Sequence, residues 1–263
     1  EGATGTGKEV AARAVHAAST RADRPFVAIN CAALPETLIE SELFGHAPGA
    51  FPGATRARYG KFEHARGGTL FLDQIDSLPM GVQGKLLTAL QDRAITPLGS
   101  NEPVALDLRV IAASKPGLAD AAAAGRFRDD LLYRLNVVTI AMPVLADRRE
   151  DIPGLFQILL AQASARHNRA APPMAPEALA DLAAREWPGN VRELRNAAER
   201  AVLGLDGGAA HAAPGRLADQ MAAHERGLIA AALTAHKGSI KATYEALGIS
   251  RKALYEKMQK HGL

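Results

Sequence analysis

The sequence has a single cysteine, Cys31, and this scarcity excludes an intramolecular disulfide. We interpret Cys31 as a small buried residue rather than a nucleophile, and its solitude fits the reducing cytoplasm. The chain also lacks any run of about 18 apolar residues, so nothing in it is predicted to span a membrane. No signal peptide is visible. These absences together favour a cytoplasmic protein.

An internal repeat is also lacking, while the material for globular cores is plentiful. Hydrophobic residues make up 48% of the 263 residues, enough for one large domain and one or two small ones. The net charge of +3 is unevenly placed. Residues 214–263 hold eight Lys and Arg against four Asp and Glu, whereas the remainder holds 23 against 24. The last segment is therefore expected to meet an anionic partner.

The first residues follow the phosphate-binding pattern G-x-x-x-x-G-K, from Gly2 to Lys8. Glycines let successive N–H groups point at phosphate oxygens, Lys8 supplies a positive charge, and residues 10–16 predict a helix behind the loop. A glycine-rich turn that serves only as a tight connection is the alternative. The residues predicted to bind ATP here are Gly2, Ala3, Thr4, Gly5, Thr6, Gly7, Lys8 and Glu9.

Two features of this loop depart from the general pattern. Only Glu1 precedes it, where an apolar strand is expected, so the sequence reads as a piece of a nucleotide-binding domain with its first strand missing. Glu9 occupies the position where the general motif has Ser or Thr to hold magnesium. The metal would therefore need a carboxylate elsewhere.

The rest of the chain is predicted to fold in segments of different character. Apolar runs at 26–29, 69–72 and 108–112 alternate with helical patterns, which indicates a parallel sheet covered on both faces. The expected division is an α/β nucleotide-binding domain over 1–143, a helical lid over 144–205, a linker over 206–216 and a helical DNA-binding domain over 217–263.

An acid ends the second of these strands, in the run from Gly67 to Gln74. Such a strand lies beside the phosphate loop in P-loop proteins, so Asp73 is the predicted magnesium ligand. The alternative is an ordinary buried strand that ends in a turn. The next residue usually carries a catalytic carboxylate, but here it is Gln74, whose amide can orient water without accepting its proton.

Three arginines are candidates for sensing the nucleotide. Arg128 and Arg134 are six residues apart and could face a neighbouring subunit, where an arginine neutralises charge that develops on the γ-phosphate. Arg192 lies in the first turn of a helix in the lid, from which it could reach the nucleotide. From the residues alone, Arg192 is interpreted as an ordinary solvated charge, and the sensing role is the alternative.

Taken together, these segments resemble the AAA+ activators of sigma-54 RNA polymerase, the bacterial enhancer-binding proteins. The resemblance covers nearly the whole chain. It also accounts for Glu9, because glutamate is usual at this position in the family. It is carried by the P-loop and by the segments Pro25–Pro35, Glu40–His46, Gly49–Ala54, Gly67–Asp73, Phe127–Asn136 and Trp187–Asn190.

The resemblance implies a ring, commonly a hexamer, with ATP and Mg²⁺ between subunits and a loop that pushes on the sigma factor. Phe51 would be the apolar tip of that loop. By the same comparison Arg128 and Arg134 resemble the trans-acting arginines, Arg192 a sensor in the lid, and Asn30 the residue that holds the catalytic acid inactive. Ser114 and Lys115 stand at another sensor of the γ-phosphate. The predicted contact loop is Gly49, Ala50, Phe51, Pro52, Gly53 and Ala54.

Three positions depart from the family pattern, and each is a working part. Pro52 replaces a loop threonine, Gln74 replaces the catalytic glutamate, and Lys115 replaces an asparagine. We hypothesise that ATP binding persists while hydrolysis and sigma contact are weak or altered. The leading interpretation remains an ATP-dependent activator bound to upstream DNA, and the alternative is a DNA-bound regulator without motor activity. An unrelated protein-remodelling ring ATPase is a third class, disfavoured by the loop and the basic tail.

The tail, residues 217–263, predicts a helix with an apolar stripe and then a helix-turn-helix. Leu228, Ile229, Ala232 and Leu233 form the stripe, and Ser239 and Ser250 are candidate N-caps around the turn at Gly248. The tail resembles a Fis-type DNA-binding unit that pairs two subunits on a palindromic site, and a basic hairpin that only dimerises is the alternative. The predicted DNA contacts are Ser250, Arg251, Lys252 and Tyr255.

The final residues also resemble those of the C4-dicarboxylate transport regulators within the family. That branch belongs to two-component systems. The resemblance therefore implies a phosphoacceptor receiver domain before Glu1.

Overall fold

The computed structural model describes residues 1–205, 225–226, 229, 232–233, 236 and 239–261. The chain divides into two compact units, residues 1–205 and residues 206–263. Among the described residues, no helix combines the length and apolar character that a bilayer crossing demands.

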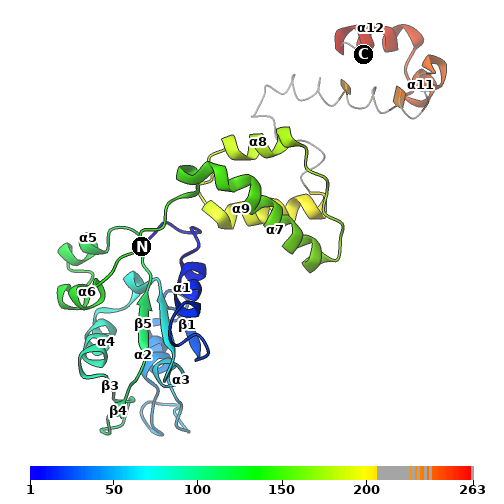
Figure 1. Cartoon of the computed structure of the whole chain (residues 1–263). Coiled ribbons are helices and arrows are strands. Elements are labelled where there is room, and N and C mark those ends of the chain that lie inside the picture. The colour runs from blue at the N-terminus through cyan, green and yellow to red at the C-terminus, as the bar shows by residue number, and fades with distance from the viewer. Residues whose placement is uncertain (206–224, 227–228, 230–231, 234–235, 237–238, 262–263) are drawn as a thin grey trace. The chain divides into compact units, whose positions relative to one another are not determined.

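A parallel three-stranded sheet forms the frame of the first unit (Figure 1). Its strands are β1 (Phe26–Asn30), β2 (Thr69–Asp73) and β5 (Arg109–Ala112), in the order β1-β2-β5. Residues 69–72 of the central strand β2 are buried, as a continuous apolar run predicts for a strand covered on both faces. The three predicted strands and their parallel arrangement are confirmed. The register pairs Asn30 with Asp73, which places two candidate site residues side by side.

Helices cover both faces of this sheet. Helix α1 (Lys8–Ala17) packs Ala12 against Phe71 and Ala113, with Phe26 and Ile111 beside them. The other face carries the larger core, in which Leu70 and Leu72 meet Ile39, Leu86 and Phe127, among others. The elements of this core region are α2 (Glu36–Phe44), α3 (Lys61–His64), η1 (Ile75–Ser77), α4 (Met80–Asp92), α5 (Leu118–Ala123) and α6 (Asp129–Leu135).

A small antiparallel hairpin, β3 (Ala94–Ile95) and β4 (Val104–Ala105), was not predicted. Each of its strands has two residues, too few for an alternating pattern to be recognised.

Four helical elements follow, and no strand is found among residues 144–205. They are η2 (Leu145–Asp151), α7 (Ile152–His167), α8 (Pro176–Ala184) and α9 (Asn190–Leu203). Prolines stand in the first turns of α7 and α8, where a missing N–H costs nothing. A second core, including Phe156, Leu160, Trp187 and Leu194, holds the elements together. This second core makes the lid a packed helical domain.

The second unit contains α11 (Ile240–Ala246) and α12 (Arg251–His261), joined by a turn at Gly248 with φ 65°. The Ser239 hydroxyl accepts the Ala242 N–H at 3.4 Å and the Ser250 hydroxyl accepts the Ala253 N–H at 3.2 Å, so both predicted caps are confirmed. Of the predicted apolar stripe, Ile229 is buried, Ala232 and Leu233 are half-buried, and Leu228 lies outside the described residues, as does the predicted linker.

Candidate nucleotide-binding site

The glycine-rich loop runs directly into α1, as predicted. Gly5 and Gly7 adopt φ values of 82° and 100°, which glycine tolerates best. Neither of their N–H groups has an acceptor among the described residues. With the free N–H groups at the start of α1, they form a cradle of donors suited to phosphate oxygens. Lys8 Nζ donates to the carbonyls of Gly2 at 2.6 Å and Ala3 at 3.1 Å, which holds the loop closed.

The lid reaches back to this loop through backbone atoms. The Val191 N–H donates to the Gly5 carbonyl at 3.0 Å, and Asn190 Nδ2 donates to the Thr4 carbonyl at 3.0 Å. A Cβ added at Gly5 would lie 2.2 Å from the Gly189 carbonyl oxygen, so glycine is required there by contact as well as by φ. The start of α9 is therefore fixed against the phosphate loop.

Two residues that hold this junction were not singled out from the sequence as site residues. Asn190 is buried at φ 50°, and its Oδ1 accepts the Leu145 N–H at 2.7 Å. Arg148 donates to the Thr6 carbonyl at 3.1 Å. The Pro-Gly-Asn turn at 188–190 was the available signal, because Asn is among the residues that tolerate a left-handed conformation.

One cavity of about 470 Å³ unites the phosphate loop, the end of β2 and the lid. Asp73 ends β2 and Gln74 follows it, Lys115 follows β5, and Arg192 comes from α9, so the cavity gathers predicted residues from three parts of the fold. Arg195, one turn after Arg192, was missed by the sequence reasoning. The lining is Thr4, Gly5, Gly7, Lys8, Glu9, Val10, Asp73, Gln74, Lys115, Val191, Arg192 and Arg195.

The charges in this cavity favour an anion. Burial is the main cause that lowers the pKa of Lys8; Asp73 and Asp76 act against it, while Arg192 and Lys115 add to it. The carboxylate of Glu9 pairs with Arg13 at 2.7 Å, four residues along α1. Asp73 is therefore the lining carboxylate without a cationic partner in the described part of the chain.

Gln74 stands in the left-handed region, with φ 55°, and faces Asn30. Its Nε2 donates to Asn30 Oδ1 at 3.2 Å, and the same oxygen accepts the Ala32 N–H at 2.9 Å. Because a backbone N–H needs an acceptor, the Ala32 bond fixes which end of the Asn30 amide faces Gln74. Asn30 thus reaches the site through Gln74 and not as a lining residue of the cavity.

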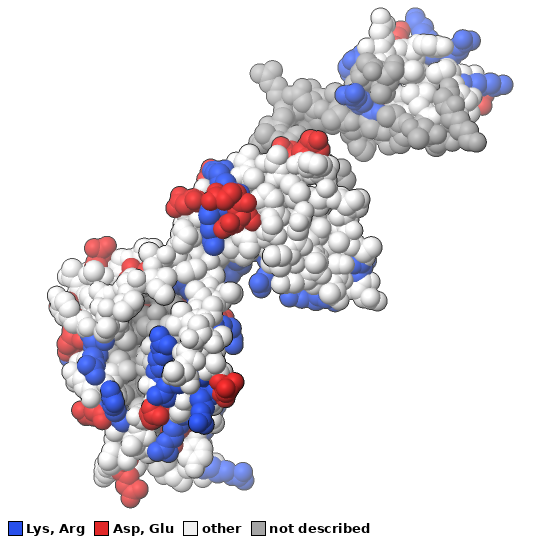
Figure 2. Space-filling model, in the orientation of Figure 1, with Lys and Arg blue, Asp and Glu red and all other residues white. Residues whose placement is uncertain are grey.

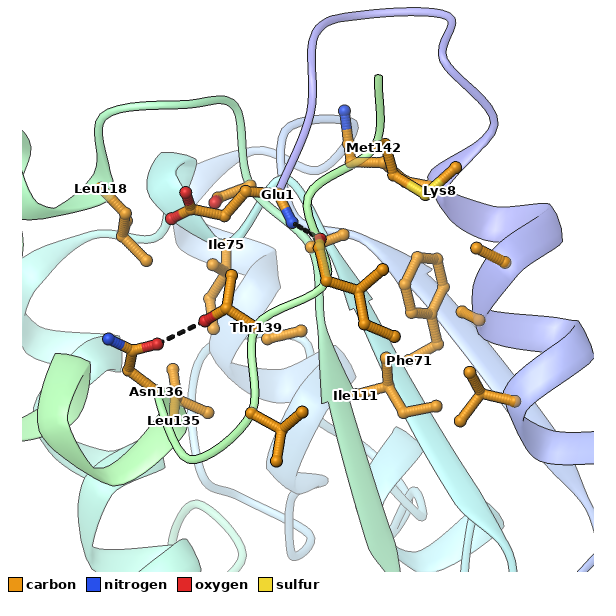
Figure 3. A pocket seen from close by; sticks show the side chains of 18 of the residues that line it. Glu1, Lys8, Phe71, Ile75, Ile111, Leu118, Leu135, Asn136, Thr139 and Met142 are labelled. Carbon is orange, nitrogen blue, oxygen red and sulfur yellow. Dashed lines mark hydrogen bonds between the residues drawn. The ribbon is translucent and has the colours of Figure 1, made fainter. Parts of the chain in front are cut away.

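Ser114 and Lys115 are neighbours in sequence but have different surroundings. It is buried, its carbonyl accepts the Gly2 N–H at 3.2 Å, and it lines a different, apolar cavity of about 150 Å³. In Figure 3, Phe71, Ile111 and Leu135 point into that second cavity. Glu1 borders it and exchanges backbone hydrogen bonds with the segment after α6, donating to Ile140 and accepting from Met142.

Arg128 and Arg134 do not line the cavity of their own chain. Arg128 pairs with Asp130 through two contacts of 3.0 and 2.7 Å, which raises the pKa of Arg128 and lowers that of Asp130. Arg134, in the last turn of α6, donates to the Leu90 carbonyl at 3.0 Å. Both side chains remain at the surface.

The loop 49–54 closes on itself and rests on the β3–β4 hairpin. The Gly49 N–H donates to the Ala54 carbonyl at 2.7 Å, and Phe51 is exposed at the tip with its ring 4.9 Å from that of His46. The Ala47 N–H donates to the Leu98 carbonyl at 2.8 Å. A Cβ at Gly99 would lie 2.8 Å from the Cβ of Ala50, so the two segments are in close contact.

The basic surface of the second unit is centred on α12. On the face shown in Figure 2, Lys and Arg predominate over Asp and Glu in this unit. Arg251 lies over the Tyr255 ring at 5.7 Å, and Lys252 is highly exposed. Lys252 pairs with Glu256 at 3.9 Å on the same helix, and Lys257 and Lys260 both pair with Glu225. Among the described residues Arg251 has no ion pair, so the predicted contacts Ser250, Arg251, Lys252 and Tyr255 lie around an unpaired guanidinium at the start of α12.

Asp73 is the residue that would coordinate a magnesium ion. In the part of the chain that the structure describes, no three His, Cys, Asp or Glu side chains converge. A hard cation that keeps several waters and binds through one carboxylate and phosphate oxygens needs no larger cluster.

A phosphate loop on a parallel sheet, a helical lid that contacts it and a separate helix-turn-helix define the AAA+ class of DNA-binding regulators. The chain belongs to the Sigma-54 interaction domain family, whose model matches residues 1–141. The AAA+ ATPase lid domain matches residues 146–227, and the Fis family of bacterial regulatory proteins matches residues 220–261.

Among its relatives, the C4-dicarboxylate transport transcriptional regulatory protein DctD of Rhizobium meliloti is 52% identical over the whole chain. ZraR of Klebsiella oxytoca is 53% identical over 78% of the chain and 46% of its own length. The structure of NtrX from Brucella abortus in complex with ATP aligns over the whole chain and 63% of its own, with TM-score 0.71 and 34% identity. The chain spans 58% of the length of DctD.

Proposed function

We propose that this protein is an ATP-dependent transcriptional activator that binds upstream DNA and remodels sigma-54 RNA polymerase. The observation that carries the proposal is the cavity that unites the phosphate loop, Asp73 and lid arginines in a chain with a helix-turn-helix. Support also comes from DctD, a transcriptional regulatory protein, and from NtrX, which has been crystallised with ATP.

Nucleotide binding follows from the donor set. The N–H groups of Gly5 and Gly7 and the start of α1 would hold phosphate oxygens, and Lys8 would leave the loop carbonyls to pair with the phosphates. Asp73 would hold Mg²⁺, which neutralises phosphate charge when bound. Arg192 and Arg195 would report the nucleotide to the lid, whose first helical turn is bonded to the same loop.

Hydrolysis would depend on Gln74 and on a neighbouring subunit. The Gln74 amide orients the attacking water without removing its proton, so turnover is slow rather than absent. Arg128 and Arg134 would enter the site of the adjacent copy in a ring, from a dimer up to a hexamer, because both lie at the surface and outside their own cavity.

The force would be delivered by the loop 49–54, with Phe51 as its apolar contact on the sigma factor. Pro52 fixes φ and has no backbone N–H. A loop with proline at this position can therefore form fewer hydrogen bonds to the sigma factor than a loop with threonine. DNA would be held by Ser250, Arg251, Lys252 and Tyr255 at the start of α12, where Lys252 is highly exposed and pairs only with Glu256 at 3.9 Å among the described residues.

The test is opening of a sigma-54 promoter by this chain. Purified protein is added to sigma-54 RNA polymerase on a promoter template, and strand separation is followed by permanganate reactivity with and without ATP. The proposal expects ATP-dependent opening that Lys8→Ala abolishes and Lys61→Ala leaves intact, since Lys61 lies outside the cavity. Absence of opening by a protein that binds ATP and DNA would contradict the activator assignment.

A further inference from the structure

Three cations that no acid balances converge on the nucleotide cavity. Lys115, Arg192 and Arg195 all line it, and none forms an ion pair or side-chain hydrogen bond within the described residues. Some arginines elsewhere in the same unit do form ion pairs, as Arg21 does with Asp107 and Arg58 with Glu42, so what distinguishes Lys115, Arg192 and Arg195 is that they share one cavity. Unpaired cations gathered from two elements point to an anionic ligand of high charge.

The count of charges around the cavity is strongly one-sided. Lys8, Lys115, Arg192 and Arg195 face it, against the carboxylates of Glu9 and Asp73. Glu9 is already engaged by Arg13, so it offsets little of this charge. At position 74 an amide follows Asp73, so the end of β2 brings one negative charge to the cavity lining, and Asp76 in η1 adds a second that acts on Lys8 from behind the lining.

The net charge of a nucleoside triphosphate depends on whether a divalent cation is bound to it. Its phosphates carry about four negative charges without a divalent cation and about two with one bound. A site with few cations therefore needs the metal to neutralise its ligand. A site with four cations in about 470 Å³ can supply that neutralisation itself.

We propose that Lys115, with Arg192 and Arg195, lets this cavity bind a nucleoside triphosphate without a divalent cation, Lys115 carrying charge that bound Mg²⁺ would otherwise neutralise. Lys115 is placed for this by its position, directly after β5 and on the same cavity as Asp73. This inference rests on the proposed nucleotide binding.

The test is a binding titration of the full chain with a fluorescent ATP analogue, in excess Mg²⁺ and in excess EDTA. The proposal expects a Kd in EDTA within about tenfold of that in Mg²⁺. Lys115→Asn should weaken binding in EDTA by about tenfold and in Mg²⁺ by much less. The matched control is Lys61→Asn, the same substitution on α3 and away from the cavity, which should change neither.

The outcomes separate the two proposals. Binding that saturates in Mg²⁺ but not in EDTA overturns the inference and leaves the nucleotide function standing. Equal effects of Lys115→Asn in both buffers, or no effect in either, also overturn it, because Lys115 would then not share a task with the metal. Failure to bind the analogue in either buffer overturns the proposed function itself. Far-UV circular dichroism verifies that each variant is folded.

Discussion

The side-chain amide of Gln74 donates a 3.2 Å hydrogen bond to Oδ1 of Asn30, an oxygen already held by the Ala32 N–H. The pair is matched in polarity, donor to acceptor. A glutamate at position 74 would set a second acceptor against Asn30 Oδ1, and Asn30 would have to turn over and release Ala32 to restore the bond. The resting place of residue 74 therefore suits an amide and not a carboxylate.

Replacing Gln74 with glutamate is expected to raise steady-state ATP turnover by at least about tenfold. A carboxylate can take the proton of the attacking water, and it is not retained by Asn30 in its present orientation. Phosphate release measures the effect. Asn30→Asp, which keeps an acceptor for both Gln74 and Ala32, serves as the control and should leave turnover low. Equal turnover with glutamine and glutamate would mean that the amide already suffices.

Replacing Asn190 with alanine is expected to lower the free energy of unfolding by about 2 to 3 kcal/mol. The change leaves the Leu145 N–H and the Thr4 carbonyl without their partner and puts alanine at φ 50°. Urea denaturation followed by circular dichroism measures the loss. Asn196→Ala, at an exposed position of the same helix, is the control, and an equal loss there would refute the role of Asn190.

Arg134→Ala is expected to bind ATP normally and to lose at least about a hundredfold in turnover, since its side chain lies outside its own cavity. Mixing two inactive variants tests whether Arg134 acts on the nucleotide site of an adjacent copy. Lys8→Ala, inactive for want of its phosphate contact, should regain activity on mixing with Arg134→Ala, because some interfaces then combine an intact loop with an intact arginine. If the mixture stays as inactive as its components, the trans assignment fails.

The two ends of α12 are expected to differ in their share of DNA binding. Arg251→Ala should weaken binding to labelled duplex DNA and lower the slope of log K against log salt by about 1. Lys257→Ala should do less, because the Lys257 ammonium is already paired with Glu225. Fluorescence anisotropy over a salt series tests both. A larger effect at Lys257 would place the DNA at the other end of the helix.

Cys31 is expected to resist alkylation in the folded protein. Burial, followed by the charges of Asp73 and Asp76, raises the pKa of Cys31 to about 12, so the reactive thiolate is nearly absent at pH 8. The raised pKa contributes stability that is complete below pH 9 and fades as pH rises toward 12. Mass spectrometry after iodoacetamide, with and without urea, is the measurement. Rapid labelling without urea would contradict the buried thiol.

Sequence reasoning located those parts of the site that are local along the chain. The apolar run at 69–72 predicted β2 because a strand buried on both faces leaves that mark, and Asp73 and Gln74 followed from its end. The bond between Asn190 and Thr4 joins residues 186 positions apart, and no periodicity encodes it. Arg195 was missed because an exposed arginine carries no mark of its own, although its spacing of three from Arg192 placed both on one helical face.

The close approach of Ala50 and Gly99 joins the exposed loop 49–54 and the β3–β4 hairpin into one structural unit. With the Ala47 bond to Leu98 at its root and the Gly99 contact at its middle, the loop cannot bend without dragging the hairpin along. A substitution that separates the two segments, such as Gly99→Val, would leave Phe51 at the tip of the loop but break the contact between the loop and the hairpin. A displacement of the hairpin would then no longer be passed on to the tip of the loop.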